Sequence, residues 1–284
     1  MQTFTTISEI RGAIAAWREQ GERIAFIPTL GNLHFGHLTL ISEAKQRAKR
    51  VVVSIFINPL QFGANEDFAN YPRTFREDSR KLAETGVDAL FAPSEQEMYP
   101  HGQHGAFIDV PTLSNILCGA HRPGHFRGVA TVVAKLFNII QPQVALFGEK
   151  DYQQLQIVRR MTTDLNMPVE IVGVPTVREP DGLAMSSRNA YLNTDERRRA
   201  AALYQALRHA RTRIEQGHAV AEVEAEGLAA LRAAGFQPDY FQVCRADDLR
   251  PAGQGDKDLI ILAAAWLGRA RLIDNVRASL KIGP

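Results

Sequence analysis

Two patterns of apolar and polar positions alternate along the first 175 residues. One is the short continuous apolar run, which is typical of a strand buried on both faces of a parallel sheet. Such runs occupy residues 24–28, 51–57, 87–91, 144–147 and 169–174. The other is an apolar residue at every third or fourth position, which indicates an amphipathic helix. It predicts helices over 38–49, 74–85, 128–140 and 153–165. The alternation as a whole predicts an α/β fold with a doubly wound parallel sheet.

Two parts of this region depart from the alternation. Near the start, Thr6-Ile7-Ser8-Glu9 has the form of a helix capping box, and helical spacing continues from there until Gly21. Residues 92–127 contain four prolines, so we expect loops in this segment around a short strand at 106–110.

The pattern changes after Pro175. Residues 194–235 are rich in alanine and arginine at helical spacing. Apolar segments that resemble strands follow near 240–244, 259–267 and 271–276. Helices followed by strands predict a smaller C-terminal α+β domain. We therefore expect one domain over 1–175 and a second over 176–284, with a turn-rich connector at 178–182.

The composition is that of an ordinary globular protein, with 45% hydrophobic residues, 23% charged residues and a net charge of +2. So small a charge gives no electrostatic reason to expect a nucleic acid or a membrane as a partner. Cys118 and Cys244 form no metal or redox motif, and the first six residues lack the features of a signal peptide. The most apolar run, 259–267, is too short to span a bilayer. We expect a cytoplasmic protein.

The segment most informative about function is PTLGNLHFGH, at residues 28–37. It lies between a predicted strand and a predicted helix, and a helix N-terminus favours phosphate because its backbone N–H groups are unpaired. Three interpretations of His34 and His37 are open. One histidine could cap the helix while the other packs against the sheet, the pair could ligate a metal, or both could donate hydrogen bonds to phosphate. The glycine-bearing turn and the absence of a suitable third ligand nearby favour phosphate.

Two further polar segments follow predicted strands in the same way. They are Asn58–Phe62 and Gly148–Gln154, and they leave the same edge of a parallel sheet as the histidine segment. Gln61 could contact a hydroxy acid, although a solvated loop position would suit it equally well. Lys150 is suited to phosphate, whereas its acidic neighbours also fit an ordinary helix N-terminus.

A fourth segment, Met185–Asn189, offers two hydroxyls and a guanidinium in a polar loop. These groups suit phosphate oxygens, and the guanidinium adds a fixed fork of donors. An ordinary turn before the helix expected at Thr194 explains the segment as well. It resembles the Lys-Met-Ser-Lys-Ser loop of class I aminoacyl-tRNA synthetases, which is paired there with His-x-Gly-His. The pair of motifs is therefore a stronger signal than either one.

Six ordered blocks carry a closer likeness: PTLGNLHFGH (28–37), FINPLQF (56–62), YPRT (71–74), GHFRGV (124–129), FGEKDYQQ (147–154) and DGLAMSSRN (181–189). Together they closely resemble the pantoate–β-alanine ligases of the nucleotidylyltransferase superfamily. The likeness extends to WLG at 266–268 and RLIDN at 271–275. Leu30 stands where the family usually has methionine, and Phe35 fills a variable position that is often acidic.

The resemblance implies a Rossmann-like fold of the His-x-Gly-His type, in which 1–175 binds ATP and pantoate and 176–284 forms a lid. It implies a ligase that activates (R)-pantoate with ATP as a pantoyl-adenylate. β-Alanine then displaces AMP to give pantothenate. Mg²⁺ and a homodimer are implied as well. Two rival interpretations are open. One is another adenylyltransferase of the superfamily. The other is an RNA-binding relative of the synthetases, which would need a basic face that the net charge of +2 does not indicate.

Roles are carried over from the family position by position. His37, His34 and Lys150 are implied to be catalytic. The implied ATP-binding residues are Leu30, Gly31, Asn32, Leu33, His34, Phe35, Gly36, His37, Gly148, Glu149, Lys150, Asp151, Val177, Met185, Ser186, Ser187 and Arg188. Gln61 and Gln154 are implied to bind pantoate or β-alanine. Glu77 and Asp78 fall where relatives place acidic residues near the metal.

Overall fold

The computed structural model describes residues 1–63, 66, 68–102, 105–253 and 255–279. The chain divides into two compact units. The first comprises Met1–Glu149 and Gln154–Pro175, and the second comprises Lys150–Gln153 with the chain from Thr176 onward. The domain boundary predicted near residue 176 is a single position in the chain. The grouping of Lys150–Gln153 with the second unit is an additional feature that the prediction does not include.

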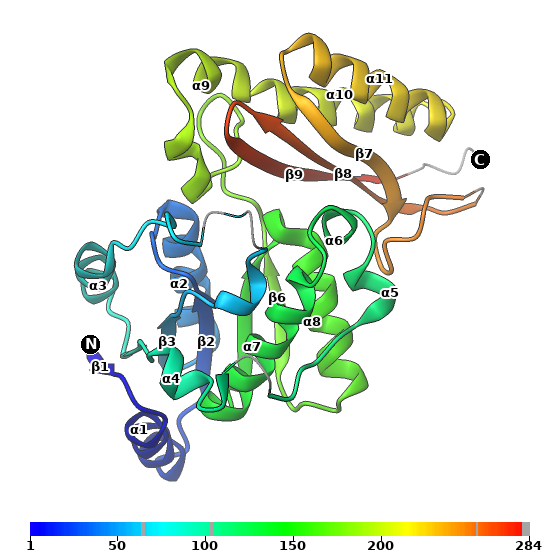
Figure 1. Cartoon of the computed structure of the whole chain (residues 1–284). Coiled ribbons are helices and arrows are strands. Elements are labelled where there is room, and N and C mark those ends of the chain that lie inside the picture. The colour runs from blue at the N-terminus through cyan, green and yellow to red at the C-terminus, as the bar shows by residue number, and fades with distance from the viewer. Residues whose placement is uncertain (64–65, 67, 103–104, 254, 280–284) are drawn as a thin grey trace. The chain divides into compact units, whose positions relative to one another are not determined.

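A six-stranded parallel sheet forms the centre of the first unit (Figure 1). Its strands are β1 (Gln2–Phe4), β2 (Ile24–Thr29), β3 (Arg50–Ile55), β4 (Ala89–Phe91), β5 (Val144–Gly148) and β6 (Glu170–Val174). The order across the sheet is β1-β4-β3-β2-β5-β6, and every pairing is parallel. This sheet and its helices confirm the expected doubly wound α/β fold.

The strand order reverses between β2 and β5, which pair directly at Ala25↔Val144 and Phe26↔Ala145. The turns that follow these two strands therefore leave the sheet at neighbouring points of its carboxyl edge. Ligands of doubly wound sheets bind at such a reversal point. The PTLGNLHFGH segment follows β2, and Glu149 follows β5.

Helices cover both faces of the sheet. They are α1 (Ile7–Glu19), α2 (Phe35–Arg47), α3 (Phe75–Glu84), α4 (Glu95–Met98), α5 (Pro111–Ser114), α6 (Cys118–His121), α7 (His125–Ile140) and α8 (Tyr152–Asp164), with the 3₁₀ turns η1 (Pro59–Gln61) and η3 (Glu149–Asp151). On one face, Ile41 of α2 and Leu82 of α3 share a buried cluster with Ile27 of β2. On the other face, Phe137 of α7 packs edge-on against Phe26 and Phe147.

One local expectation is wrong, and one strand was not expected. Residues 106–110 form no strand, because the backbone N–H of Ile108 donates to the Thr131 hydroxyl of α7 at 2.9 Å and not to a neighbouring strand. The three-residue strand β1 was not expected, since so short a segment carries no readable pattern, yet it pairs with β4 from Gln2↔Ala89 to Phe4↔Phe91. The capping box at Thr6 is confirmed: its hydroxyl accepts from the N–H of Glu9.

The second unit has the expected α+β architecture. Its antiparallel sheet runs β7-β8-β9, formed by Gln237–Arg245, Asp258–Leu267 and Ala270–Ser279. Its helices are α9 (Thr194–Ala200), α10 (Ala202–Glu215) and α11 (Val220–Ala233), preceded by the 3₁₀ turn η4 (Ser187–Tyr191). Among the described residues, no helix has the length and apolar character needed to cross a membrane.

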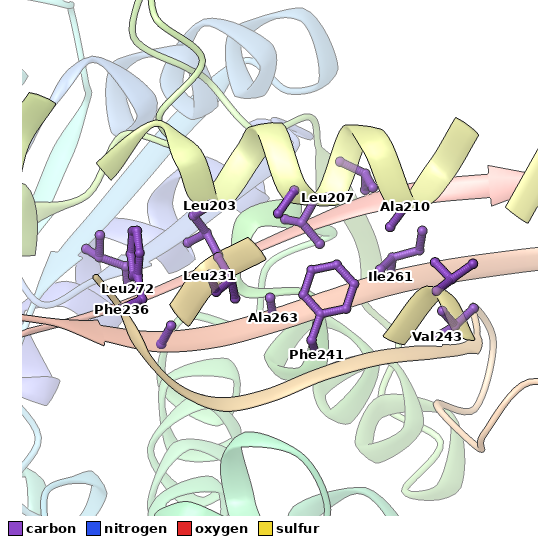
Figure 2. Packing of buried hydrophobic residues seen from close by; sticks show 14 of the residues in the cluster. Leu203, Leu207, Ala210, Leu231, Phe236, Phe241, Val243, Ile261, Ala263 and Leu272 are labelled. Carbon is purple, nitrogen blue, oxygen red and sulfur yellow. The ribbon is translucent and has the colours of Figure 1, made fainter. Parts of the chain in front are cut away.

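One face of this small sheet is covered by α10 and α11. Figure 2 shows Leu203 and Leu207 of α10 above Ile261 and Ala263 of β8, within a cluster of buried apolar side chains. Helix α11 approaches β7 closely at Gly227, where an added Cβ would lie 2.4 Å from the Phe241 ring. This core gives the second unit a hydrophobic interior of its own.

Candidate functional site

The segment after β2 turns sharply before it enters α2. Gly31 and Asn32 both have positive φ angles, of 84° and 52°, and glycine adopts that conformation without the cost that a Cβ imposes. The N–H of Gly31 donates to the Thr29 hydroxyl at 3.2 Å, and that hydroxyl donates to the carbonyl of Ser54 at 2.7 Å. The turn is thereby fixed to the ends of β2 and β3.

His34 and His37 cap α2 reciprocally. The Nδ1 atom of His34 accepts from the N–H of Gly36 at 3.1 Å, and the Nδ1 atom of His37 accepts from the N–H of His34 at 3.2 Å. The rings lie 4.2 Å apart, centroid to centroid. Because His34 is the N-cap, α2 begins at Phe35, three residues before the start predicted from apolar spacing. Phe35 itself is 62% exposed.

These hydrogen bonds determine the tautomer of both imidazoles. A ring nitrogen that accepts from a backbone N–H carries no proton, so the proton of each neutral ring is on Nε2. Both histidines then present Nε2–H as a hydrogen-bond donor. The capping interpretation and the phosphate interpretation are therefore compatible, since Nδ1 serves the first and Nε2–H serves the second. No group of three or more metal-ligating side chains occurs among the described residues.

A buried carboxylate holds the same turn from the side of α3. Asp78 is 1% exposed, and its Oδ2 and Oδ1 atoms accept from the N–H groups of Asn32 and Leu33, each at 2.8 Å. The Thr74 hydroxyl donates to Oδ2 at 2.9 Å. One helical turn further along α3, Lys81 Nζ donates to the carbonyl of Leu33 at 2.8 Å.

This arrangement does not fit a magnesium site at Glu77 and Asp78. Both oxygens of Asp78 already accept hydrogen bonds from the turn, whereas Mg²⁺ needs oxygen lone pairs that point at the ion. Glu77 pairs with the ammonium of Lys81 at 2.8 Å, and this contact keeps the pKa of the Glu77 carboxyl below its usual range. A divalent cation here would compete with that lysine.

A buried hydrogen-bond chain reaches Gln61 in the turn after β3. The Tyr99 hydroxyl donates to Oδ1 of Asn58 at 2.8 Å, and Nδ2 of Asn58 donates to Oε1 of Gln61 at 3.1 Å and to the carbonyl of Gly128 at 3.0 Å. Burial raises the pKa of Tyr99, so its phenol stays protonated and donates. Because Oε1 of Gln61 accepts from Asn58, the amide is oriented with Nε2 as the group that can donate to a ligand.

The backbone of Gln61 is fixed as well. Its carbonyl lies 2.7 Å from Nδ1 of His125, and Nε2 of the same ring lies 2.9 Å from Nη1 of Arg122. Arginine only donates, so Nε2 accepts and Nδ1–H donates to Gln61. Helix α7 comes so close to η1 that a Cβ at Gly128 would lie 2.2 Å from the carbonyl oxygen of Leu60. This contact explains the second glycine of GHFRGV.

Lys150 and the Met185–Arg188 loop belong to the second unit, where β9 contacts both Arg178 and the backbone of Lys150. Arg178 makes two hydrogen bonds to the carboxylate of Asp274, at 2.6 and 3.0 Å, and also donates to the carbonyl of Asn275. The side-chain amide of Asn275 donates to the carbonyl of Lys150 at 3.0 Å. Burial raises the pKa of Asp274 while Arg178 opposes the rise.

The Met185–Arg188 loop is reached from Arg178 by a short antiparallel connection. Arg178 forms a β-bridge with Ala184, and the N–H of Met185 donates to the carbonyl of Val177 at 3.0 Å. At the end of this connection the Ser186 hydroxyl caps η4 by accepting from the N–H of Arg188 at 3.2 Å. The loop is therefore an ordered turn before a helix, and this geometry is compatible with both interpretations considered from sequence.

The predicted site residues are thus divided between the units. The first unit contains Leu30–His37, Gln61, Gly148, Glu149 and Gln154, and the second contains Lys150, Asp151, Val177, Met185, Ser186, Ser187 and Arg188. Sequence reasoning missed Tyr99, Asn58 and Asn275 as supporting residues. Asn58 and Asn275 lie inside blocks that carry the family resemblance, whereas nothing in the sequence points to Tyr99.

Comparison with known proteins settles the family. The sequence model described as Pantoate-beta-alanine ligase matches residues 2–277. The chain belongs to this family. Membership confirms the expected enzyme class, a ligase of an acid and an amine that forms pantothenate, and it confirms the resemblance drawn from the six blocks.

Relatives of the family are similar over nearly their whole length. The chain is 55% identical to a pantothenate synthetase of Pseudomonas putida, with 99% of each chain covered, and 56% identical to one of Azotobacter vinelandii, with 99% and 100% covered. A pantothenate synthetase structure from Thermus thermophilus matches with a TM-score of 0.92 and 49% identity, covering 97% of this chain and 99% of that one. A pantoate–β-alanine ligase from Francisella tularensis, complexed with β-γ ATP and β-alanine, matches with a TM-score of 0.81 and 34% identity, covering 97% of each.

Proposed function

We propose that the protein condenses (R)-pantoate with β-alanine at the expense of ATP, through a pantoyl-adenylate, and releases AMP and diphosphate. The observation that carries the proposal is the pair of Nε2–H donors on His34 and His37, held at the carboxyl edge of the sheet beside the strand reversal. Family membership and the Francisella tularensis relative, whose complex contains an ATP compound and β-alanine, support the same substrates.

The chemistry has two displacement steps. The pantoate carboxylate attacks the α-phosphorus of ATP, a P–O bond forms, and the bond to diphosphate breaks with its electron pair. The amine of β-alanine then attacks the acyl carbon, an amide bond forms, AMP leaves, and the amine loses its proton. A carboxylate and an amine do not condense directly in water, so the adenylate supplies the leaving group. Catalysis rests mainly on positioning and on charge stabilisation.

The two imidazoles have a defined part in the first step. Negative charge builds on the phosphate oxygens as diphosphate departs, and preorganised donors stabilise such charge most where water is excluded. His34 and His37 offer Nε2–H groups in the tautomer that hydrogen-bond donation requires, and His37 would donate such a hydrogen bond to the leaving diphosphate. The backbone N–H of Gly36 and that of His34 hold the rings in this state.

Gln61 and Gln154 are proposed to bind pantoate. For Gln61 the structure supports a defined direction, because Asn58 occupies Oε1 and leaves Nε2–H for an acceptor on the ligand. The carboxylate and hydroxyl oxygens of pantoate are such acceptors. Gln154 lies in the first turns of α8, in the unit that also contains Gln61.

The remaining roles are proposed from the positions of the family motifs. Lys150, Ser186, Ser187 and Arg188 would bind phosphate, Gly148 and Asp151 the ribose, and Val177 and Met185 would line the nucleotide site. The region 176–284 would act as the lid that keeps water from the adenylate. Mg²⁺ would enter with ATP as part of the substrate, bound to its phosphates. The homodimer and the cytoplasmic location stay predictions.

Exchange of labelled diphosphate into ATP tests the first step by itself. With pantoate present and β-alanine absent, we expect exchange, and without a carboxylate we expect none. A carboxylic acid of similar size without the hydroxyl groups of pantoate serves as the matched control. Exchange at the same rate with and without pantoate, or exchange that requires a nucleotide acceptor instead of pantoate, would overturn the proposal. The protein would then be another adenylyltransferase of the superfamily.

A further inference from the structure

We propose that Asp78 is a positioning residue for His34 and His37 and not a ligand of magnesium. The proposal rests on the function proposed above, since it concerns the histidines of that site. It assigns to Asp78 the task of holding the turn from which both imidazoles take their hydrogen bonds.

The carboxylate of Asp78 fills the turn after β2. Gly31 and Asn32 have positive φ angles in succession, a conformation that directs neighbouring N–H groups at one anion. That anion is the Asp78 carboxylate, which accepts from Asn32 and Leu33 at 2.8 Å each. The turn also packs onto the carboxylate, because a Cβ at Gly31 would lie 3.2 Å from Oδ2. A side chain of the protein therefore already occupies this anion-binding turn.

Leu33 connects this turn to the catalytic rings. Leu33 directly precedes His34, and the N–H of His34 is the group that His37 Nδ1 accepts from. A shift of Leu33 would move that N–H and with it the hydrogen bond that sets the tautomer and the direction of His37. Lys81 fixes the carbonyl of Leu33 from the same helix, so both polar groups of the Leu33 backbone are held by α3.

An amide in place of the carboxylate cannot accept all of these hydrogen bonds. Asp78→Asn keeps the size of the side chain but replaces one acceptor oxygen by an NH₂ group. That group would then face a backbone N–H or the Thr74 hydroxyl, and the turn would have to move or lose a hydrogen bond. Misplacement of a catalytic group by about 1 Å costs about 100-fold in rate.

The test compares Asp78→Asn with Glu77→Gln and with Glu84→Gln, an exposed α3 carboxylate that pairs with Arg80. The rate of pantoate-dependent diphosphate exchange is measured as a function of the ATP concentration and of the Mg²⁺ concentration. Hydrogen exchange is followed at the backbone amides of Asn32 and Leu33. For Asp78→Asn we expect kcat to fall about 100-fold, KM for ATP to change less than about threefold, and the Mg²⁺ requirement to stay unchanged. The two amides should exchange faster. Glu84→Gln should stay within about twofold of the parent enzyme, and Glu77→Gln should leave the Mg²⁺ requirement unchanged.

Several results would overturn the proposal. A raised Mg²⁺ requirement in both Asp78→Asn and Glu77→Gln, with rescue by excess Mg²⁺, would show a metal site. A lowered melting temperature with unchanged kcat would show a purely structural role. Thr74→Val removes one donor to Oδ2 of Asp78 and keeps the hydrogen bonds between Asp78 and the turn. It serves as a second, milder variant in case Asp78→Asn misfolds, and its kcat should fall by less than that of Asp78→Asn. If the parent enzyme shows no pantoate-dependent exchange, the proposed function fails, while the amide exchange still reports whether Asp78 holds the turn.

Discussion

The side-chain amide of Asn275, on β9, donates a hydrogen bond to the backbone carbonyl of Lys150 at 3.0 Å. The two residues are 125 positions apart, yet this contact fixes the backbone from which the proposed phosphate-binding ammonium extends. Asn275 is 8% exposed, so water replaces the bond poorly.

We predict that Asn275→Asp lowers kcat more than Asn275→Ala does. Alanine removes the donor, whereas aspartate directs a carboxylate oxygen at the carbonyl of Lys150. For the alanine variant we expect a loss of about 1–3 kcal/mol of folding stability, the cost of an unsatisfied buried polar group, and a lower kcat because the backbone at Lys150 is held less firmly. Steady-state kinetics with varied ATP measure kcat. Equal effects of the two substitutions would contradict the directional role of the amide.

His34→Asn should separate capping from catalysis. Asparagine is a good N-cap, so the stability of α2 is retained, but the Nε2–H donor is lost. We expect diphosphate exchange to fall about 100-fold or more, with a melting temperature close to that of the parent enzyme. His34→Ala, which loses both functions, should unfold more easily by about 1 kcal/mol. If His34→Asn kept full activity, the phosphate role of this ring would be wrong.

His37→Ala should depress adenylate formation severely while the fold stays intact. His37 is not the N-cap of α2, so its loss costs the helix less than the loss of His34. We expect a decrease of about 100- to 1000-fold in exchange, the effect of removing one preorganised donor. Circular dichroism verifies folding. Near-normal turnover would remove the central claim about this ring.

Tyr99→Phe should raise KM for pantoate and leave KM for ATP unchanged. Without the phenol, Oδ1 of Asn58 loses the nearer of its two donors and keeps only the N–H of Leu60 at 3.3 Å, so the Asn58 amide holds Gln61 less firmly. Removal of one partner from a buried polar pair costs about 1–3 kcal/mol of stability. Kinetics with each substrate varied in turn measure the first effect. A parallel increase of KM for ATP would contradict the assignment of Gln61 to pantoate.

Tyr99 also predicts a pH dependence of stability. Burial raises the pKa of its phenol in the folded state above the usual 10.0, so the protonated form is favoured by folding. This contribution is complete below the unfolded-state pKa and is lost as the pH rises through the folded-state pKa. The free energy of unfolding should therefore fall less steeply above about pH 10 in Tyr99→Phe than in the parent chain. Urea unfolding at about pH 8 and about pH 10.5, on either side of the ordinary tyrosine pKa, makes the comparison.

Five of the six parallel strands could be predicted from the sequence to within two residues, because burial on both faces leaves continuous apolar runs such as 51–53 and 144–147. The start of α2 could not be placed, since its N-cap is a histidine and histidine is absent from the common capping residues. The strand expected at 106–110 does not form, because the N–H of Ile108 donates to Thr131. No local sequence pattern indicates this tertiary contact.

The candidate site shows the same limit. His34, His37 and Gln61 could be selected from their place after predicted strands. Their hydrogen-bonding states could not, because each depends on a group brought near by folding: two backbone N–H groups for the rings and Asn58 for the amide. Asp78 looked like a metal ligand from its sequence position. Its contacts with the turn appear only once α3 is placed against the end of β2.

The grouping of Lys150–Gln153 with the second unit bears on how the protein could be dissected or recombined. Tyr152, 2% exposed, donates through its hydroxyl to the carbonyl of Ala246 at 2.9 Å, and Arg277 donates to that hydroxyl at 3.0 Å. A fragment cut at residue 176 would lack this tyrosine and the Lys150 carbonyl. Residues 176–284 are therefore not a separable module. A chimaera that exchanged them between relatives would also have to exchange Lys150–Gln153.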